Sequence, residues 1–424
     1  MYNVILIAID TLRADHLSHY GYKYQTCKNL DNFSKNAIVF KNAFSCINAT
    51  DPSFTSLFTG KEPHNHGINN HGRKITQQDI NLFDSHKVRW LTSVLKEHGY
   101  NTAGIDWLGR WHKKDYDEYP FGILNFYGSF QGKNKSFRDC RAMTGEGVKW
   151  IKRLKGNPFF LFMHYWDVHK PYNYRSKLTR RKFPHNQKYV SEYDAAIYNV
   201  DKQLKRIFKM LKKHNLIEKS IIIITADHGE SLGEHGICCD HHGLYECSMK
   251  IPLLIYMPGL PHKTIHSFVQ TTDVMPTLLE LLDIDFGEEE FDGASLLPLI
   301  KGEKRHVRDK LFFKETFYEK KFAIQTSKYK FIIAKHEQDA TCSACNRIHG
   351  DSLIELYDLE KDPEELNNIY LEHSDVVDNL RQEIIDHFGK DYFKEATADE
   401  EKNTASEGEE QRLIEERLKA LGYF

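Results

Sequence analysis

Acidic and imidazole side chains follow three apolar segments of the sequence, and they are the first candidates for chemistry. Asp10 ends the segment NVILIAID, Asp167 and His169 follow FFLFMHYW, and Asp227 and His228 follow IIIITA. A single such group is common, because Asp often caps the helix that follows a strand. Together they predict a site of carboxylates and imidazoles, a ligand mixture that suits Zn²⁺, Mn²⁺, Mg²⁺ or Ca²⁺.

The segment NATDPSFTSLFTG, residues 48–60, places Thr50 just before a short apolar helix that is predicted to begin near Pro52 and Ser53. A threonine hydroxyl is a poor nucleophile unless a dication binds its oxygen and favours the alkoxide. The N-terminus of a helix would also favour negative charge there. Two interpretations stay open: Thr50 is a nucleophile beside a metal, or Thr50 or Asp51 only caps the helix.

Apolar and amphipathic segments alternate along most of the chain. Strands are predicted at 3–10, 101–106, 157–167, 220–230 and 251–259, and helices at 89–100, 145–156, 191–215 and 271–284. This β-α-β-α order predicts a mostly parallel sheet with helices on both faces. Because crossovers between parallel strands are right-handed, the carboxyl ends of the strands share one edge, and the polar groups should converge there.

The pattern changes near residue 305. Aromatic-rich, alternating strands within 310–335 and a strand at the start of 355–369 indicate an antiparallel sheet, followed by helices at 375–388 and 409–424. The acidic segment 394–410 between those helices is typical of a linker. We therefore predict an α/β catalytic domain at 1–304, an antiparallel α+β subdomain at 305–390, and a linker with a terminal helix at 391–424.

Composition restricts the class of protein. Of the 424 residues, 40% are hydrophobic and 28% are charged, as in soluble globular proteins, and the net charge of −2 gives no field that favours nucleic acid. The first apolar run, Val4 to Ile9, is too short for a signal peptide, and no apolar run approaches the roughly 18 residues of a membrane span. These features predict a cytoplasmic chain; its oligomeric state stays open.

The eight cysteines favour free thiols, because disulfides are rare in the cytoplasm. One segment, CSACNRIH, carries Cys342, Cys345 and His349 at a spacing that could hold a structural zinc ion. Such a site needs a further ligand. Cys238 and Cys239 are candidates, but adjacent cysteines have poor ligand spacing.

Six segments occur in the order expected of one known family: NVILIAIDTLRADHLSHYGY, TDPSFTSLFTGKEPHNHGI, WDVHKPY, ITADHGESLGEHG, YECSMKIPLLIYMPG and ELYDLEKDPEELNNI. In this order they resemble the sulfatases of the alkaline-phosphatase superfamily. The resemblance runs from residue 3 to about 370, and the closing RLKALGYF is also similar to sulfatase chains. It implies an alkaline-phosphatase-like three-layer sandwich with a small C-terminal antiparallel subdomain.

The resemblance also implies roles for individual residues. Asp10, Asp227 and His228 match metal ligands, and Thr50 matches the nucleophile, which also touches the metal. His169 matches the histidine that contacts the bound sulfate or phosphate.

Other residues match the part of the family site that meets the ester. His242 matches a position that binds the ester or protonates the leaving group, and His241 lies where many sulfatases carry a lysine. Lys170 and Tyr172 are substrate-binding candidates, although a solvated lysine and a packing aromatic are equally ordinary. Weaker candidates are read as packing or loop-structuring side chains: Trp107, Trp111, His64, His66, His71 and His235.

Three positions depart from the family pattern. Sulfatases carry Cys or Ser, matured to formylglycine, in a Cys-x-Pro-Ser-Arg motif, where this chain has Thr50. Threonine cannot become formylglycine, because its extra methyl group would give a ketone. Phe54 replaces the supporting arginine, and Thr11 replaces the second Asp after the first strand.

Threonine nucleophiles occur in superfamily branches that act on phosphorus. The resemblance therefore implies a metal-dependent hydrolase of a small anionic phosphate ester, with phosphodiesters or phosphonate monoesters favoured. A sulfuric ester hydrolase and a phospho-group transferase are the alternatives. A non-catalytic binding protein is disfavoured, because a dead site has no physical reason to keep paired buried charges.

The missing carboxylate and the nearby imidazoles favour Mn²⁺ or Zn²⁺, with Ca²⁺ or Mg²⁺ as alternatives. A second ion would need Asp167, His169 and His242. Because the Asp-x-His spacing is shorter than the two-metal pattern, one ion is favoured over two.

Overall fold

A computed structural model describes residues 1–106, 111–119, 139–172, 177–287, 290–350 and 352–389. Its larger sheet has seven strands in the order β3-β4-β1-β5-β8-β2-β9. Their bounds are β1 Asn3–Ile9, β2 Ile38–Phe44, β3 Asn101–Ile105, β4 Phe159–Tyr165, β5 Ser220–Thr225, β8 Lys250–Tyr256 and β9 Lys263–Gln270. β1 pairs in parallel with both β4 and β5, and every residue of β1 is buried. The mostly parallel sheet is confirmed.

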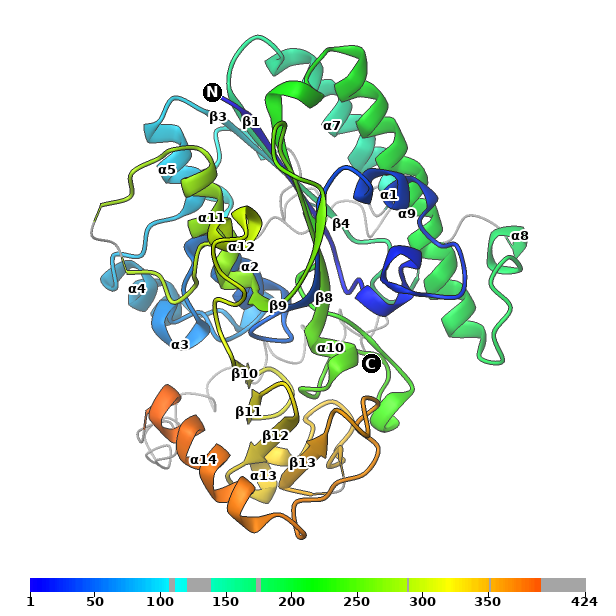
Figure 1. The fold of residues 1–424 in the computed structure, drawn as a ribbon, viewed down its shortest axis with the longest axis vertical. Coiled ribbons are helices and arrows are strands. Elements are labelled where there is room, and N and C mark those ends of the chain that lie inside the picture. The colour runs from blue at the N-terminus through cyan, green and yellow to red at the C-terminus, as the bar shows by residue number, and fades with distance from the viewer. Residues whose placement is uncertain (107–110, 120–138, 173–176, 288–289, 351, 390–424) are drawn as a thin grey trace, which may run out of the picture.

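Helices cover both faces of this sheet, so the predicted three-layer sandwich is confirmed (Figure 1). One layer holds α2, α5, α11 and α12, and the other holds α1, α7 and α9. The α-helices of the described residues are α1 Lys28–Ser34, α2 Thr50–Thr59, α3 Pro63–His66, α4 Gln77–Ser85, α5 Leu91–Glu97, α7 Cys140–Leu154, α8 Lys177–Arg180, α9 Lys188–Lys213, α10 Glu246–Met249, α11 Val274–Leu281, α12 Leu297–Lys301, α13 Glu337–Ala340 and α14 Ser374–Phe388. In the described ranges, no helix combines the length and the apolar character needed to cross a membrane.

Three details differ from the sequence-based expectation. The strand predicted at 251–259 is β8, which runs antiparallel to both of its neighbours, β5 and β2. The strands β2 and β9 were not predicted. Helix α2 begins at Thr50, two residues earlier than expected.

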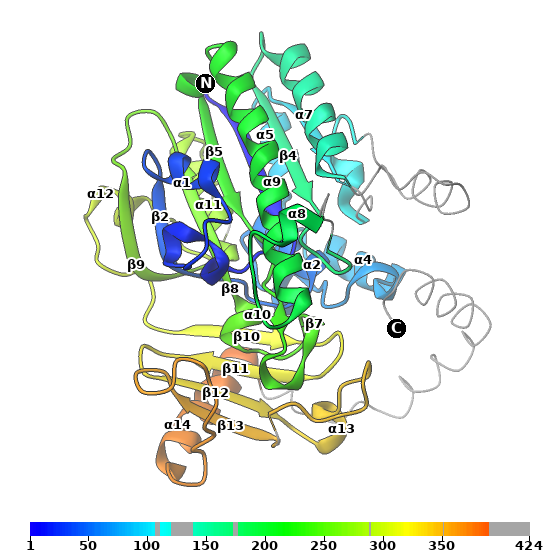
Figure 2. The same ribbon diagram turned by 90° about the vertical axis from the view of Figure 1, so that its right-hand side faces the viewer.

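The smaller sheet is antiparallel, as predicted, with β10 Leu311–Glu315, β11 Lys321–Gln325, β12 Tyr329–Ala334 and β13 Ile354–Asp358 in chain order. It lies against the end of the larger domain (Figure 2). Its alternating side chains explain this packing, because each face is buried against a different partner. One face, including Phe322 and Ile324, packs on α14, and the other, including Phe313 and Ala323, packs on Tyr245 and its neighbours in the larger domain. The linker and terminal helix predicted at 391–424 lie outside the described residues.

Strand β10 also contacts the segment that leads to Thr50. The backbone N–H of Lys314 donates to the carbonyl of Cys46 at 3.1 Å. The Lys314 side chain is buried and donates to Asn69 Oδ1 at 2.8 Å. Burial lowers the pKa of Lys314 to about 7. The antiparallel subdomain therefore contacts the segment before Thr50 through its backbone, and the buried amine of Lys314 holds Asn69.

This lysine predicts a pH dependence of stability. Between about pH 7 and the ordinary lysine pKa of about 10.4, the unfolded chain binds more protons at Lys314 than the folded chain does. Stability should therefore rise with pH, by about 2 kcal/mol between pH 7 and pH 9 through this group. Lys314→Met should remove that increment, as measured by urea unfolding at both pH values. The same slope in both proteins would contradict the assignment.

Candidate active site

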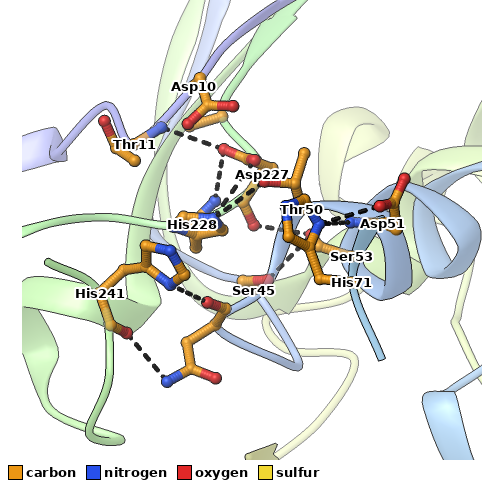
Figure 3. A network of polar contacts seen from close by, with 12 residues as sticks. Asp10, Thr11, Ser45, Thr50, Asp51, Ser53, His71, Asp227, His228 and His241 are labelled. Carbon is orange, nitrogen blue, oxygen red and sulfur yellow. Dashed lines mark hydrogen bonds and ion pairs between the residues drawn. The ribbon is translucent and has the colours of Figure 1, made fainter. Parts of the chain in front are cut away.

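Three predicted metal ligands meet at the carboxyl ends of neighbouring strands. Asp10 follows β1, and Asp227 and His228 follow β5 (Figure 3). All three side chains are buried, and one ligand atom from each lies within 4.8 Å of those of the others. The geometry therefore agrees with the prediction that the parallel strands bring these groups together.

The hydrogen bonds around this group leave oxygen atoms available for a cation. Asp227 Oδ1 accepts from the backbone N–H groups of Thr11 at 3.1 Å and His228 at 2.9 Å. Among the described residues, Asp227 Oδ2 and Asp10 Oδ1 have no hydrogen-bond partner, and Asp10 Oδ2 lies 3.1 Å from Nε2 of the buried His164. Buried carboxylates this close together are costly without a compensating charge. The pKa of Asp227 is nevertheless lowered: burial raises it, and the neighbouring His228 and His164 outweigh burial.

The orientation of His228 suits the same ligand set. Its Nδ1 lies 2.9 Å from the carbonyl of Gly229, which fixes the proton on Nδ1 and leaves a lone pair on Nε2. The Nε2 atom lies 3.4 Å from Asp227 Oδ2 and 3.4 Å from Thr50 Oγ1. Asp10, Asp227, His228 and Thr50 thus fit a divalent cation in their donor types and in their unsatisfied oxygens.

Thr50 is the first residue of α2, and it does not act as the cap. The N-cap position is Ala49, whose side chain makes no cap, and the backbone N–H of Asp51 donates to His71 Nδ1 at 3.3 Å. Asp51 is occupied elsewhere, because its Oδ2 pairs with His71 Nδ1 at 2.9 Å and accepts from the Gly72 N–H at 2.7 Å. Of the two interpretations of the segment, capping by Thr50 or Asp51 does not occur. The buried Thr50 hydroxyl instead faces the metal-ligand group (Figure 3).

The start of α2 is tied to the end of β5. Ser53 Oγ donates to the carbonyl of Asp227 at 2.6 Å, and Ser45 Oγ lies 3.0 Å from Ser53 Oγ. All ten residues of α2 are buried. These contacts fix Thr50 relative to the carboxylates, and they place the positive end of the helix dipole beside its hydroxyl.

Two further histidines face this group. The ring centroid of His241 lies 4.3 Å from that of His228, and the centroid of His169 lies 6.2 Å from that of His241. The Nδ1 atoms of His169 and His241 each lie 2.6 Å from a backbone carbonyl. Burial lowers the pKa of both rings. Both are therefore neutral near pH 7, with an Nε2 lone pair that can take up a proton.

His242 is placed differently from His241. Its ring centroid lies 4.8 Å from that of His349, and its ligand atom groups with Cys342 and Cys345. The two neighbouring histidines thus enter different clusters, and His241 is the one beside His228.

The remaining candidates lie around the site. Lys170 is exposed and Tyr172 is half-buried, with its ring 5.4 Å from that of Tyr193. Trp111 packs on Phe83, and Trp107 lies outside the described residues.

The residues required for a second metal do not form a group. Asp167 accepts from the N–H of Cys140 at 3.0 Å and clusters with Asp139 and Cys140. Within the described ranges, Asp167 and His242 belong to different close groups of possible metal ligands, and His169 belongs to none.

Sequence reasoning missed a buried chain of polar groups behind Asp10. His164, on β4, has Nε2 at 3.1 Å from Asp10 Oδ2 and Nδ1 at 3.0 Å from Asp106 Oδ1. Burial opposes protonation of this ring, but Asp106 and Asp10 outweigh it and raise the pKa of His164 to about 9. Phe54 packs edge-on against this ring at 4.7 Å. The position that carries arginine in the family motif is thus apolar here, and His164 supplies the positive partner of Asp10.

Thr11 shows where the backbone is strained. Its φ of 54° lies in the left-handed region, which a β-branched residue rarely adopts. Three hydrogen bonds hold it: its N–H donates to Asp227, its carbonyl accepts from Tyr193 Oη at 2.7 Å, and its hydroxyl donates to the carbonyl of Val168 at 3.1 Å. The hydroxyl is thus held by Val168, and Thr11 brings no negative charge in place of the missing carboxylate.

Comparison with known proteins agrees with this arrangement. The sulfatase family model matches residues 2–284, and the model described as N-sulphoglucosamine sulphohydrolase, C-terminal, matches residues 233–390. An arylsulfatase of Clostridium perfringens is 22% identical over 90% of this chain and 93% of its own length. Arylsulfatase A of Bos taurus is 24% identical over 90% of this chain and 85% of its own length.

Solved structures show the same fold. The phosphonate monoester hydrolase of Agrobacterium radiobacter aligns with a TM-score of 0.71 and 18% identity, over 91% of this chain and 95% of that one. Most of the similar proteins are named sulfatases, so the names favour sulfuric esters, the alternative above, over phosphate esters. Members of the family generally use a divalent metal ion, which the ligand group at Asp10 fits. Because the sulfatase family model matches residues 2–284, the chain belongs to the sulfatase family of the alkaline-phosphatase superfamily.

Proposed function

We propose that the chain is a metal-dependent hydrolase of small anionic phosphate esters, with phosphodiesters or phosphonate monoesters as its substrates and Thr50 as its nucleophile. One observation carries this proposal: a threonine, which cannot be converted to formylglycine, lies buried at the start of α2 with its hydroxyl 3.4 Å from His228. An alkoxide nucleophile leaves a covalent ester that water must attack directly, and a phosphothreonine beside a dication allows this attack.

The residues divide the reaction between them. A divalent cation held by Asp10, Asp227 and His228 would favour the ionised hydroxyl and neutralise the charge of the ester. Thr50 Oγ1 attacks phosphorus in line, so that a Thr–O–P bond forms while the bond to the leaving-group oxygen breaks. The N–H groups at the start of α2 favour the negative charge that develops.

Proton transfer falls to the neutral imidazoles. His241 and His169 carry Nε2 lone pairs, so either ring can take up a proton and return it to the leaving alkoxide. Once protonated, the same ring donates to an anionic oxygen of the ester. Water then attacks phosphorus, releases the phosphate or phosphonate, and regenerates Thr50. We assign this role to His241 in preference to His242, because His241 is the ring beside His228.

The proposed metal is a single Mn²⁺ or Zn²⁺ ion. The described ligand set has two carboxylates and one imidazole, and Thr11 adds none. This set is poorer in oxygen than Ca²⁺ prefers.

Sulfuric ester hydrolysis is the second candidate, and the names of the relatives favour it. The same ligands would serve, but water would have to cleave a sulfated threonine without the aldehyde hydrate that expels sulfate in formylglycine enzymes.

A substrate panel tests the proposal. The metal-loaded protein is assayed with aryl phosphodiester, phosphonate monoester, phosphomonoester and sulfate ester substrates that share one leaving group. We expect kcat/KM for a phosphorus ester to exceed that for the sulfate ester by about a hundredfold or more, or about 3 kcal/mol of transition-state stabilisation. A larger kcat/KM for the sulfate ester would overturn the proposal and establish the second candidate.

A further inference from the structure

A second group of metal-ligand side chains lies between the antiparallel subdomain and the larger domain. It consists of His242, Cys342, Cys345 and His349, with one ligand atom of each within 4.8 Å of the others. His242, Cys342 and His349 are buried, and Cys345 is exposed. In a tetrahedral zinc site with Zn–S and Zn–N bonds of about 2.3 and 2.0 Å, ligand atoms lie about 3.3–3.8 Å apart. Small side-chain adjustments would reach that geometry.

A short hairpin presents the two cysteines together. Thr341 and Ile348 form an antiparallel bridge that closes it. Inside it, the N–H of Cys342 donates to the carbonyl of Arg347 at 2.8 Å, and Asn346 turns the chain with a φ of 55°. The segment between β12 and β13 is therefore folded into a compact turn around the C-x-x-C sequence.

The backbone of this turn also surrounds the Cys342 sulfur, which is buried. The N–H groups of Ala344 and Cys345 hydrogen-bond this sulfur. The same donors would hydrogen-bond a thiolate, which is the form of cysteine that binds zinc.

Both histidines are oriented as zinc ligands usually are, with the second ring nitrogen near an oxygen acceptor. His349 has Nε2 at 3.1 Å from Cys345 Sγ and Nδ1 at 3.3 Å from the carbonyl of His235. His242 has Nδ1 at 3.5 Å from Asp240 Oδ1. The His235 carbonyl favours the proton on Nδ1 of His349 and directs its Nε2 lone pair to Cys345, and Asp240 is the acceptor near Nδ1 of His242.

We propose that His242, Cys342, Cys345 and His349 bind a structural Zn²⁺ ion. The site is distinct from the ligand group at Asp10 and does not depend on the reaction proposed above. Two thiolates and two imidazoles form a donor set that zinc prefers, whereas Ca²⁺ and Mg²⁺ prefer oxygen. Because the fourth ligand comes from the larger domain, the ion would fasten the hairpin 341–348 to the loop after β7, Cys238–Asp240.

The position of this loop links the zinc to the active site. His241, the residue before the proposed ligand His242, lies beside His228. Tyr318 lies between the two clusters, because its ring centroid is 5.9 Å from that of His241 and 5.1 Å from that of His242. The carbonyl of Tyr318 accepts from the N–H of Ser343 at 2.9 Å, which ties it to the cysteine hairpin. The zinc ion would thus act as a positioning element for His241.

Metal analysis of the full chain tests the site. The parent protein carries Asp227→Asn, so that the other metal site does not contribute. Zinc per chain is measured by mass spectrometry in this parent and in the same protein with Cys345→Ser or Cys238→Ser added. We expect one zinc per chain in the parent and in the Cys238→Ser control, and a loss to below about a tenth in Cys345→Ser. Because Cys345 and Cys238 are both exposed, neither change should unfold the protein, and circular dichroism verifies this.

A second variant separates ligation from a packing role. Cys345→His puts a nitrogen ligand in place of the sulfur ligand, so this variant should retain most of the zinc that Cys345→Ser loses. Cobalt substitution should give a sulfur-to-cobalt absorption band in the parent and a weaker band in Cys345→His. Equal zinc in the Cys345→Ser variant and its parent would overturn the proposal, as would a folded parent without zinc or with Cys342 and Cys345 joined in a disulfide.

Discussion

Replacing Thr50 by alanine is expected to lower kcat by about a thousandfold or more, because the reaction then lacks the oxygen that forms the covalent bond to phosphorus. The metal should still bind, since Asp10, Asp227 and His228 remain in place. The measurement is turnover of the best substrate together with metal content. Loss of activity with metal retained separates a missing nucleophile from a collapsed site.

Matched variants sharpen this test. Thr50→Val keeps the shape of the buried side chain without the hydroxyl and should be as inactive as Thr50→Ala, whereas Thr50→Ser keeps the hydroxyl and should retain substantial activity. Acid quenching of the wild type during turnover should trap a phosphate group on the peptide that contains Thr50. Wild-type turnover by Thr50→Val would refute the proposed mechanism.

The central strands of the fold could be predicted because their burial is uniform. The apolar runs 4–9 and 221–224 are short for buried helices and indicate strands buried on both faces, and the helices between them favour parallel pairing. The strand β2 could not be predicted, because Lys41 and Asn42 interrupt its apolar run next to a shift in its pairing register. The antiparallel direction of β8 could not be predicted, because the order of strands and helices along the sequence does not distinguish a crossover connection from a connection that reverses the chain.

The site could be predicted where its residues directly follow such strands. Asp10 and Asp227 were visible for this reason. His164 was not, because a single histidine inside the apolar segment FFLFMHYW is indistinguishable from a buried structural side chain until its neighbours Asp10 and Asp106 are placed. The contact of His242 with Cys342 joins positions about a hundred residues apart, which no local spacing can reveal.

Of the substitutions proposed here, the loss of the Asp227 carboxylate should lower metal affinity the most. In Asp227→Asn, an isosteric amide can still accept hydrogen bonds from Thr11 and His228 through its oxygen, so the backbone around it should persist. The negative charge beside Asp10 is lost, however. We expect metal affinity to fall by about a hundredfold and turnover by about a thousandfold or more.

Thermal unfolding with and without metal measures this effect directly. A metal present at a hundred times its Kd stabilises the wild type by about 2.7 kcal/mol, and after a hundredfold loss of affinity this increment should fall to about 0.4 kcal/mol in Asp227→Asn at the same concentration. The control is Asp201→Asn, which alters a buried carboxylate that accepts from the N–H groups of Asn29 and Leu30, away from the metal ligands. It should lower the stability of the fold and keep the full metal increment, because its charge does not face the cation. A full metal increment in Asp227→Asn would mean that the cation binds elsewhere, and Thr50 would then have no metal to activate it.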